Sequence, residues 1–263
     1  MGSPEPWEVA PEVFCLGPQG FTQTNIYFVG AASDWFLVDC GWASDGPRIG
    51  EAANSLFGAD SPPKAILLTH YHPDHAGPAR NLALAWNCSV YLHPLELPLA
   101  SGDLAAMTQY AGPQDRWVVL PLMRAMGKRR RDEILSRSSL ADVAGELESH
   151  GVVPGLGGWR WILTPGHTPG HVAFFREADR VLISGDALVN LQLNSLWGLM
   201  RQRPGLSGPP WYTTWNRRAA RESIFRLAAL EPAVVAGGHG TPRTDLATAA
   251  DVAAFAERLG RSS

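Results

Sequence analysis

The sequence predicts an α/β protein in which β-sheets are covered by helices. Short apolar runs typical of buried strands alternate along the chain with segments of helical periodicity. This alternation is typical of layered α/β architectures. A length of 263 residues is within the range of one large domain, so we expect a single domain spanning residues 1–263.

Segments that are short, apolar and bounded by turn-forming residues are predicted to be strands. They are residues 25–30, 35–39, 65–69, 89–93, 160–164, 171–175, 180–184 and 233–237. Helices are predicted at residues 139–151, where Ser139 and Gly151 are start and stop signals, at about 214–230, and in the alanine-rich segment after Thr244.

The region from about residue 95 to 154 departs from this alternation. It has no convincing strand and several helical patterns, so we expect a helical insertion on the sheet scaffold, with a lid over the active site as one interpretation. The basic run Lys-Arg-Arg-Arg at residues 128–131 is expected to be a solvated helix face.

Composition bounds the partners and the compartment. A net charge of -3 gives no broad attraction to nucleic acid or to an anionic membrane. The chain has no apolar run of about 18 residues and no secretory signal, so we expect a cytoplasmic protein with a small-molecule substrate. Cys15, Cys40 and Cys88 lack CxxC spacing and are expected to be buried thiols, in neither disulfides nor a zinc cluster.

The motif THYHPDHAG, at residues 69–77, places three of the chain's eight histidines close together. Buried titratable groups need partners, and a metal ion would use all of them. His70 and His72 leave the end of a strand on the same side and can share one ion. Asp74 and His75 follow a proline on the first turn of a helix, point in another direction and suit a second ion.

Further candidate ligands follow other predicted strands. His167 lies in a Gly/Pro loop, Asp186 follows a buried strand and a glycine, and His239 is flanked by glycines after a strand. Because open α/β sheets build their sites from loops at one edge, we expect these side chains to join the histidine cluster. His171, at the start of a strand, is expected to play a supporting role.

In chain order the motifs are Asp39 in FLVDCG, HxHxDH at residues 70–75, His167, Asp186 and His239. Their order resembles the metallo-β-lactamase superfamily, whose pattern is a strand-end aspartate, HxHxDH, a lone histidine, a lone aspartate and a final histidine. The resemblance implies an αββα sandwich of two mixed sheets flanked by helices, with a dinuclear metal site at one edge.

The resemblance also implies a first ligand triad, a second triad, a bridging ligand and a residue that supports a ligand imidazole. In that order these are His70, His72 and His167; Asp74, His75 and His239; Asp186; and Asp39. Imidazole and carboxylate ligands favour two zinc ions, with manganese or iron as alternatives. A hydroxide shared between the two ions would be the nucleophile, so the three aspartates are candidate catalytic residues.

Bulky apolar residues near these motifs are candidates for an apolar substrate pocket, although packing of the core or lid is an equally good interpretation. They are Trp42, Trp117, Met123, Trp197 and Trp211.

The leading functional hypothesis is a dinuclear zinc hydrolase of ester, thioester or lactone bonds in a fairly apolar small molecule. The best-known zinc β-lactamases have a cysteine where Asp186 stands, which disfavours that subgroup. The alternatives are a mononuclear iron oxygenase of the persulfide-oxidising kind, a β-lactam or phosphodiester hydrolase, and a catalytically silent binding protein.

Overall fold

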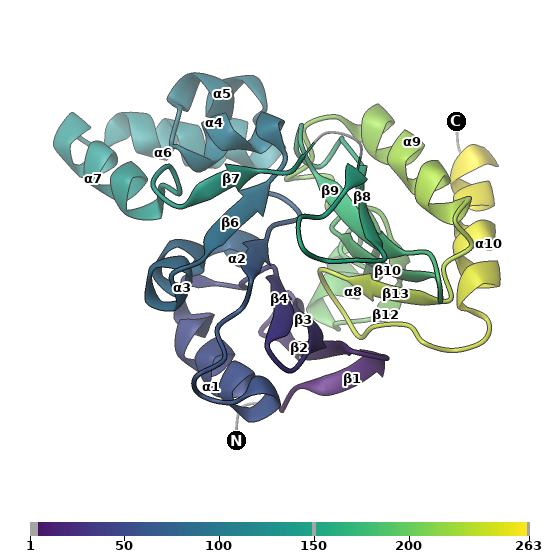
Figure 1. Ribbon diagram of the computed structural model, residues 1–263. Coiled ribbons are helices and arrows are strands. Elements are labelled where there is room, and N and C mark those ends of the chain that lie inside the picture. Colours follow the sequence, from purple (N-terminus) through teal and green to yellow (C-terminus); the bar gives the residue numbers. More distant parts are fainter. Residues whose placement is uncertain (1–4, 149–150, 262–263) are drawn as a thin grey trace.

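The computed structural model describes residues 5–148 and 151–261 and contains two main β-sheets packed face to face (Figure 1). Helices cover the outer face of each sheet, so the fold is the αββα sandwich that the resemblance implies. Within the described part of the chain, no helix is both long and apolar enough to cross a membrane.

The first sheet has seven strands in chain order, antiparallel up to β4 and parallel from β4 onward. They are β1 (Trp7–Ala10), β2 (Val13–Gln19), β3 (Thr24–Ala31), β4 (Asp34–Val38), β5 (Ala65–Leu67), β6 (Ser89–Leu92) and β7 (Ala144–Glu146).

The second sheet has the order β13-β10-β9-β8, and a separate two-stranded sheet follows β10 in the chain. The strands are β8 (Trp159–Leu163), β9 (Val172–Arg176), β10 (Val181–Gly185), β11 (Val189–Leu191), β12 (Pro204–Ser207) and β13 (Val234–Gly237). Only β10 and β13 run parallel to each other.

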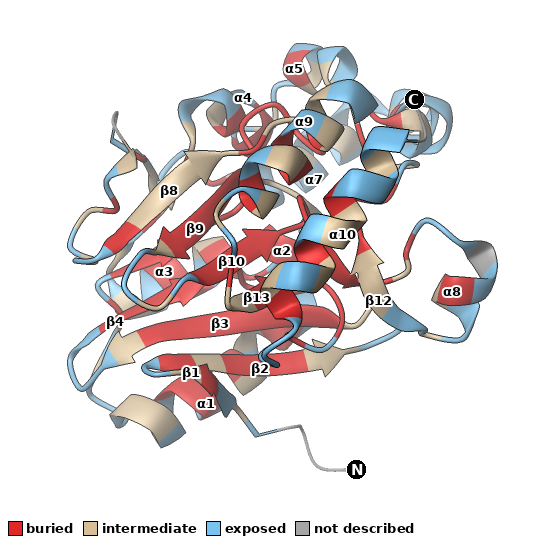
Figure 2. Ribbon diagram, turned by 90° about the vertical axis from the view of Figure 1, so that its right-hand side faces the viewer, coloured by how far each residue is buried: buried red, intermediate tan, exposed pale blue. Residues whose placement is uncertain are grey.

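Side-chain alternation along the strands builds two kinds of core. On β3, Ile26 and Phe28 face the helices outside the first sheet, whereas Tyr27 faces the second sheet. Phe174 and Ile183 belong to the same inter-sheet core. In Figure 2 these central strands are buried along most of their length, whereas α9 and α10 expose their outer sides.

The outer helices lie on opposite sides of the sandwich in Figure 1. Helices α1 (Gly46–Phe57) and α3 (Ala79–Trp86) pack on the first sheet, and α9 (Arg217–Ala228) and α10 (Thr248–Arg261) on the second. Shorter elements are η1 (Ala43–Asp45), α2 (Pro73–Ala76) and α8 (Leu196–Met200).

Between β6 and β7 the chain is helical. The elements of this insertion are η2 (Pro94–Glu96), α4 (Leu97–Ala100), α5 (Leu104–Gln109), the π-helix η3 (Asp115–Val119), α6 (Leu120–Ala125) and α7 (Lys128–Ser138). The basic run at residues 128–131 opens α7 and is mostly exposed, as expected.

The predicted helix at residues 139–151 is wrong. Helix α7 ends at Ser138, and residues 144–146 form β7, which pairs with β6. Leu140 and Leu147, expected on one helix face, instead enter the cores on opposite sides of the first sheet. Pairing with β6 overrides a weak local helix pattern. Residues 149–150 of that prediction lie outside the described residues.

Candidate metal centre

The carboxyl ends of strands from both sheets place the candidate ligands at one edge of the sandwich. Asp39 directly follows β4, and residues 70–75 run from the end of β5 into α2. Asp186 follows β10, and His239 follows β13. His167 comes from the loop between β8 and β9.

Among the described residues, three sets of three side chains each present one ligand atom within 4.8 Å of the others. One set, His70, His75 and Asp186, connects the other two. The other two are His70, His72 and His167, and Asp74, His75 and His239. In the former of these two, Nε2 of His70 lies 3.1 Å from Nδ1 of His72. These two are the triads that the resemblance implies, and below they are called the first and second groups.

Asp186 lies between the two groups and faces both. Its Oδ2 is 3.3 Å from Nε2 of His167 in the first group. Its Oδ1 is 3.3 Å from Nε2 of His75 and 3.2 Å from Nε2 of His239 in the second group. A carboxylate in this orientation can bridge two cations.

Hydrogen bonds fix the tautomers of the second-group histidines. Nδ1 of His75 donates to Oδ2 of Asp39 at 2.8 Å, and Nδ1 of His239 donates to the backbone oxygen of Thr22 at 2.9 Å. Because Nδ1 is the fixed donor, Nε2 is the nitrogen that gives up its proton and offers its lone pair when a metal binds.

Two threonine hydroxyls fix the tautomers of the first-group residues His70 and His167. The Thr69 hydroxyl donates to Oδ2 of Asp39 at 2.8 Å, which leaves its lone pair to accept from Nδ1 of His70 at 3.0 Å. The Thr214 hydroxyl donates to a backbone oxygen at 2.6 Å and faces Nδ1 of His167 at 3.5 Å. Nε2 is therefore the unprotonated nitrogen of both rings; that of His70 lies against Nδ1 of His72, and that of His167 has no hydrogen-bond partner.

Asp39 supports both groups because its backbone turns it inward. It is buried, has a φ of 57°, and accepts from the backbone N–H of Thr69 at 2.8 Å as well as from His75. Aspartate is among the few non-glycine residues that adopt this left-handed conformation readily.

The donor set fits divalent cations. Nε2 of His75, Nε2 of His167 and Oδ1 of Asp186 are buried atoms without a hydrogen-bond partner. Leaving buried polar atoms unsatisfied is unfavourable, whereas imidazole nitrogens and carboxylate oxygens are good ligands for a divalent metal.

The two groups differ in how strongly they hold protons. In the first group, burial and the neighbouring histidines lower the pKa of His70 and His167 well below the usual value. In the second group, burial also favours the neutral form, but nearby carboxylates, chiefly Asp186, raise the pKa of His75 and His239. Burial alone would raise the pKa of Asp186, but the two second-group histidines outweigh it and lower that pKa well below its usual value.

His171 has the supporting role expected of it. Its Nε2 accepts the backbone N–H of Asp186 at 3.0 Å, and its Nδ1 lies 2.7 Å from the hydroxyl of Thr164. Burial lowers the pKa of His171 to about 3, so the ring stays neutral and holds the backbone of the bridging residue in place.

Gly238 leaves room for the centre. A Cβ atom at this position would lie 2.8 Å from Cε1 of His75 and would collide with Oδ1 of Asp186. The absence of a side chain therefore lets the ends of β10 and β13 bring their ligands together.

A cavity of about 380 Å³ opens beside the first group, between α2 and the insertion. His72 and Thr168 lie in its wall, with Asp115 as its one carboxylate. Its apolar lining includes Leu99, Met107, Val119, Leu120, Met123, Ile134 and Leu135. Among the described residues that line it, none is lysine or arginine. The cavity suits an uncharged, apolar group next to the metal ligands.

The residues predicted to form the pocket are divided. Trp42 and Met123 line the cavity. Trp117, Trp197 and Trp211 are 76%, 67% and 50% exposed and lie outside its lining.

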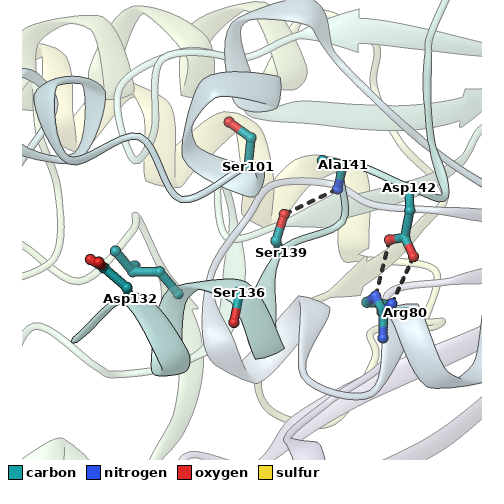
Figure 3. A pocket seen from close by; sticks show the side chains of 8 residues that line it. Arg80, Ser101, Asp132, Ser136, Ser139, Ala141 and Asp142 are labelled. Atoms are coloured by element: carbon teal, nitrogen blue, oxygen red, sulfur yellow. Dashed lines mark hydrogen bonds and ion pairs between the residues drawn. The ribbon is translucent and has the colours of Figure 1, made fainter. Parts of the chain in front are cut away.

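A second hollow, of about 440 Å³, lies on the other side of α7 (Figure 3). Most of the residues that line it have polar side chains, and Arg80 is already paired with Asp142 at 2.7 Å. None of the candidate metal ligands lines it, so its size does not make it the active site. Leu135 lines both hollows, so α7 contributes to the walls of both.

Sequence reasoning missed several polar partners of the centre. Thr69 carries a detectable signal, because a hydroxyl directly precedes the first ligand histidine. Thr214 and Glu96 carry none, since they contact His167 and Gly170 across 47 and 74 residues of chain.

The comparisons with known proteins agree with this geometry. Residues 19–239 match the family model described as the Metallo-beta-lactamase superfamily. The chain belongs to this superfamily, and its fold carries histidine and aspartate groups suited to a divalent metal.

Similar proteins include a probable metallo-hydrolase, YflN of Bacillus subtilis (strain 168), which is 35% identical over 89% of this chain and 87% of its own. The structure of TTHA1623 in a di-iron-bound form is 29% identical, with a TM-score of 0.52 over 88% of this chain and 94% of that one. The family protein TTHA1429 from Thermus thermophilus shares the fold, with a TM-score of 0.63 and 22% identity over 97% and 81% of the two chains. The relatives support a metal-dependent hydrolase in general.

Proposed function

We propose that the protein is a dinuclear zinc-dependent hydrolase that cleaves ester, thioester or lactone bonds in a fairly apolar small molecule. The observation that carries this proposal is the orientation of Asp186, whose two oxygens face the two ligand groups separately. A mononuclear oxygenase would need only the first group.

Two bound ions would lower the pKa of a shared water to about 7 and stabilise the leaving atom, as in other two-metal hydrolases. The protein's own side chains orient the metal ligands and bind the substrate. Asp39 and His171 hold the ligands in one orientation, and the cavity beside His72 binds the apolar part of the substrate next to the reacting bond. Such positioning supplies much of the rate enhancement in enzymes.

Zinc is the proposed metal because imidazole and carboxylate ligands suit it. Iron is the main alternative to zinc, because the structure of TTHA1623 is of a di-iron-bound form. Elemental analysis of protein saturated with zinc should give two ions per chain. One ion per chain after saturation contradicts the dinuclear proposal.

The function is tested with zinc-loaded protein of known metal content and a panel of apolar esters, thioesters, lactones, β-lactams, phosphodiesters and a glutathione persulfide. We expect hydrolysis of one of the first three classes, with faster turnover of apolar acyl groups. Turnover of only a β-lactam or phosphodiester would change the substrate class. Oxygen uptake with the persulfide by protein holding one iron would replace the hydrolase proposal. Ligand binding without turnover would indicate a silent binding protein.

A further inference from the structure

Glu96 is a buried charged residue whose role is not explained by the metal ligands. It is the last residue of η2, where the insertion leaves the first sheet, and its exposed fraction is 0%. The described part of the chain places no lysine or arginine in an ion pair with it. A buried carboxylate without a cationic partner is unfavourable unless hydrogen bonds stabilise it.

Backbone N–H groups from two different loops supply those hydrogen bonds. Oε2 of Glu96 accepts from the N–H of Tyr71 at 2.8 Å, and Oε1 accepts from the N–H of Gly170 at 2.7 Å. Tyr71 lies between His70 and His72, and Gly170 follows the loop that carries His167. Each carboxylate oxygen therefore holds one of the two segments that form the first group.

The loop of Gly170 packs closely against this carboxylate. A Cβ atom at Gly170 would lie 2.9 Å from Cγ of Glu96 and 3.0 Å from Nδ1 of His93. The loop reaches the carboxylate only because it has no side chain here. Burial raises the pKa of Glu96 above its usual value, and the hydrogen bonds from Tyr71 and Gly170 together with the nearby His72 oppose that shift.

We propose that Glu96 is a positioning residue for the first metal: its two carboxylate oxygens fix the distance between the segment of His70 and His72 and the loop of His167. Neither hydrogen bond reaches the second group, whose members are held by Asp39 and by the backbone of Thr22. Glu96 therefore acts on one metal and not on the other.

Glu96→Gln tests this role because it keeps the size of the side chain. An amide has one acceptor oxygen, so it can hold only one of the two loops, and its NH₂ group opposes the N–H of the other. Removing a partner that orients ligands typically lowers metal affinity by about 10–100-fold. We expect a loss of this size for the first zinc.

The two zinc affinities are separated by making the substitution in two backgrounds and measuring competition with a chelator. In His239→Ala, which retains the first group, Glu96→Gln should weaken zinc binding. In His72→Ala, which retains the second group, it should leave zinc binding unchanged. Glu133→Gln is the matched control, because Glu133 is exposed on α7 in the same insertion and pairs only with Arg137 at 2.7 Å. It should change neither affinity.

A purely structural role for Glu96 predicts a lower melting temperature with equal losses of affinity in both backgrounds, and that result would overturn the proposal. Unchanged affinity in the His239→Ala background would overturn it as well. If Glu96→Gln does not fold, Gly170→Ala provides the same comparison, because its methyl group pushes the His167 loop away from Glu96 and should weaken only the first site. The measurement uses zinc alone, so it stands or falls independently of the proposed substrates.

Discussion

At the scale of single residues, Asp186 is the side chain on which the dinuclear proposal depends most. Asp186→Ala should lower kcat/KM by well over a hundredfold, since even residues that only orient ligands change activity by about 10–100-fold. The fold should survive, because the sheets pack through other side chains. Turnover assays and circular dichroism check this. Near-normal turnover in a folded variant means that Asp186 does not bridge two metals.

Gly238 provides a test of the space in the centre. Gly238→Ala should reduce zinc binding strongly, because the added methyl group would occupy the gap between His75 and Asp186. Gly50→Ala in α1 is the control, since a Cβ there meets nothing within 4 Å. That change should leave zinc binding intact and favour the helix by about 1 kcal/mol. Equal zinc affinity in both variants would show that the ligands do not close around Gly238.

At the scale of elements, strands with an uninterrupted apolar run were predictable, including β8 and β13 at the edges of the second sheet, whereas interrupted or very short strands were not. β3, β9 and β10 are apolar on both faces, so their composition alone indicates burial. β2 was not predicted, because Gly17 and Pro18 interrupt its pattern. β7 has three residues and depends on pairing with β6. Local sequence predicts a strand when the strand's own apolar residues indicate that it is buried. It fails when the strand forms only because a neighbouring strand pairs with it.

The insertion offers a matched pair of adjacent residues for testing substrate choice. Met123 lines the cavity, whereas Leu122, beside it on α6, is 63% exposed. Met123→Ala should lower kcat/KM for long acyl substrates by at least about tenfold, because the contact of even one methylene in an apolar pocket contributes roughly 1–3 kcal/mol. Leu122→Ala should leave it unchanged. Kinetics on short and long acyl esters, with metal content confirmed, make the comparison. Unchanged selectivity in Met123→Ala would leave the insertion as packing.

At the scale of the whole molecule, the sequence predicts which residues form the candidate metal centre. It does not predict the hydrogen bonds that hold those residues in position. The order of Asp39, HxHxDH, His167, Asp186 and His239 was enough to locate one edge of the sandwich. The hydrogen bonds of Thr214 and Glu96 were out of reach, because their partners come from distant segments that only the folded sheets bring together. The residues that line the cavity were predictable only in part, because they too come from segments that are far apart in the sequence.

The fold also gives the histidines of the first and second groups different pKa values. Metal binding is therefore predicted to depend on pH. In the metal-free protein, His70 and His167 have lowered pKa values and are neutral near pH 6, ready to bind. His75 and His239 have raised pKa values, so a metal must displace their protons. Each displaced proton weakens metal binding about tenfold for every pH unit below the pKa.

We therefore expect two zinc ions per chain at pH 8, and at pH 6 a weakened second ion with the first retained. Competition titrations against a chelator across this range measure both steps. The His239→Ala variant, which lacks one second-group ligand, should show only the first, weakly pH-dependent step. If, as the pH falls, the tighter-bound zinc is lost at a higher pH than the second zinc, the prediction is wrong. In that case the raised pKa values would not belong to the second-group histidines.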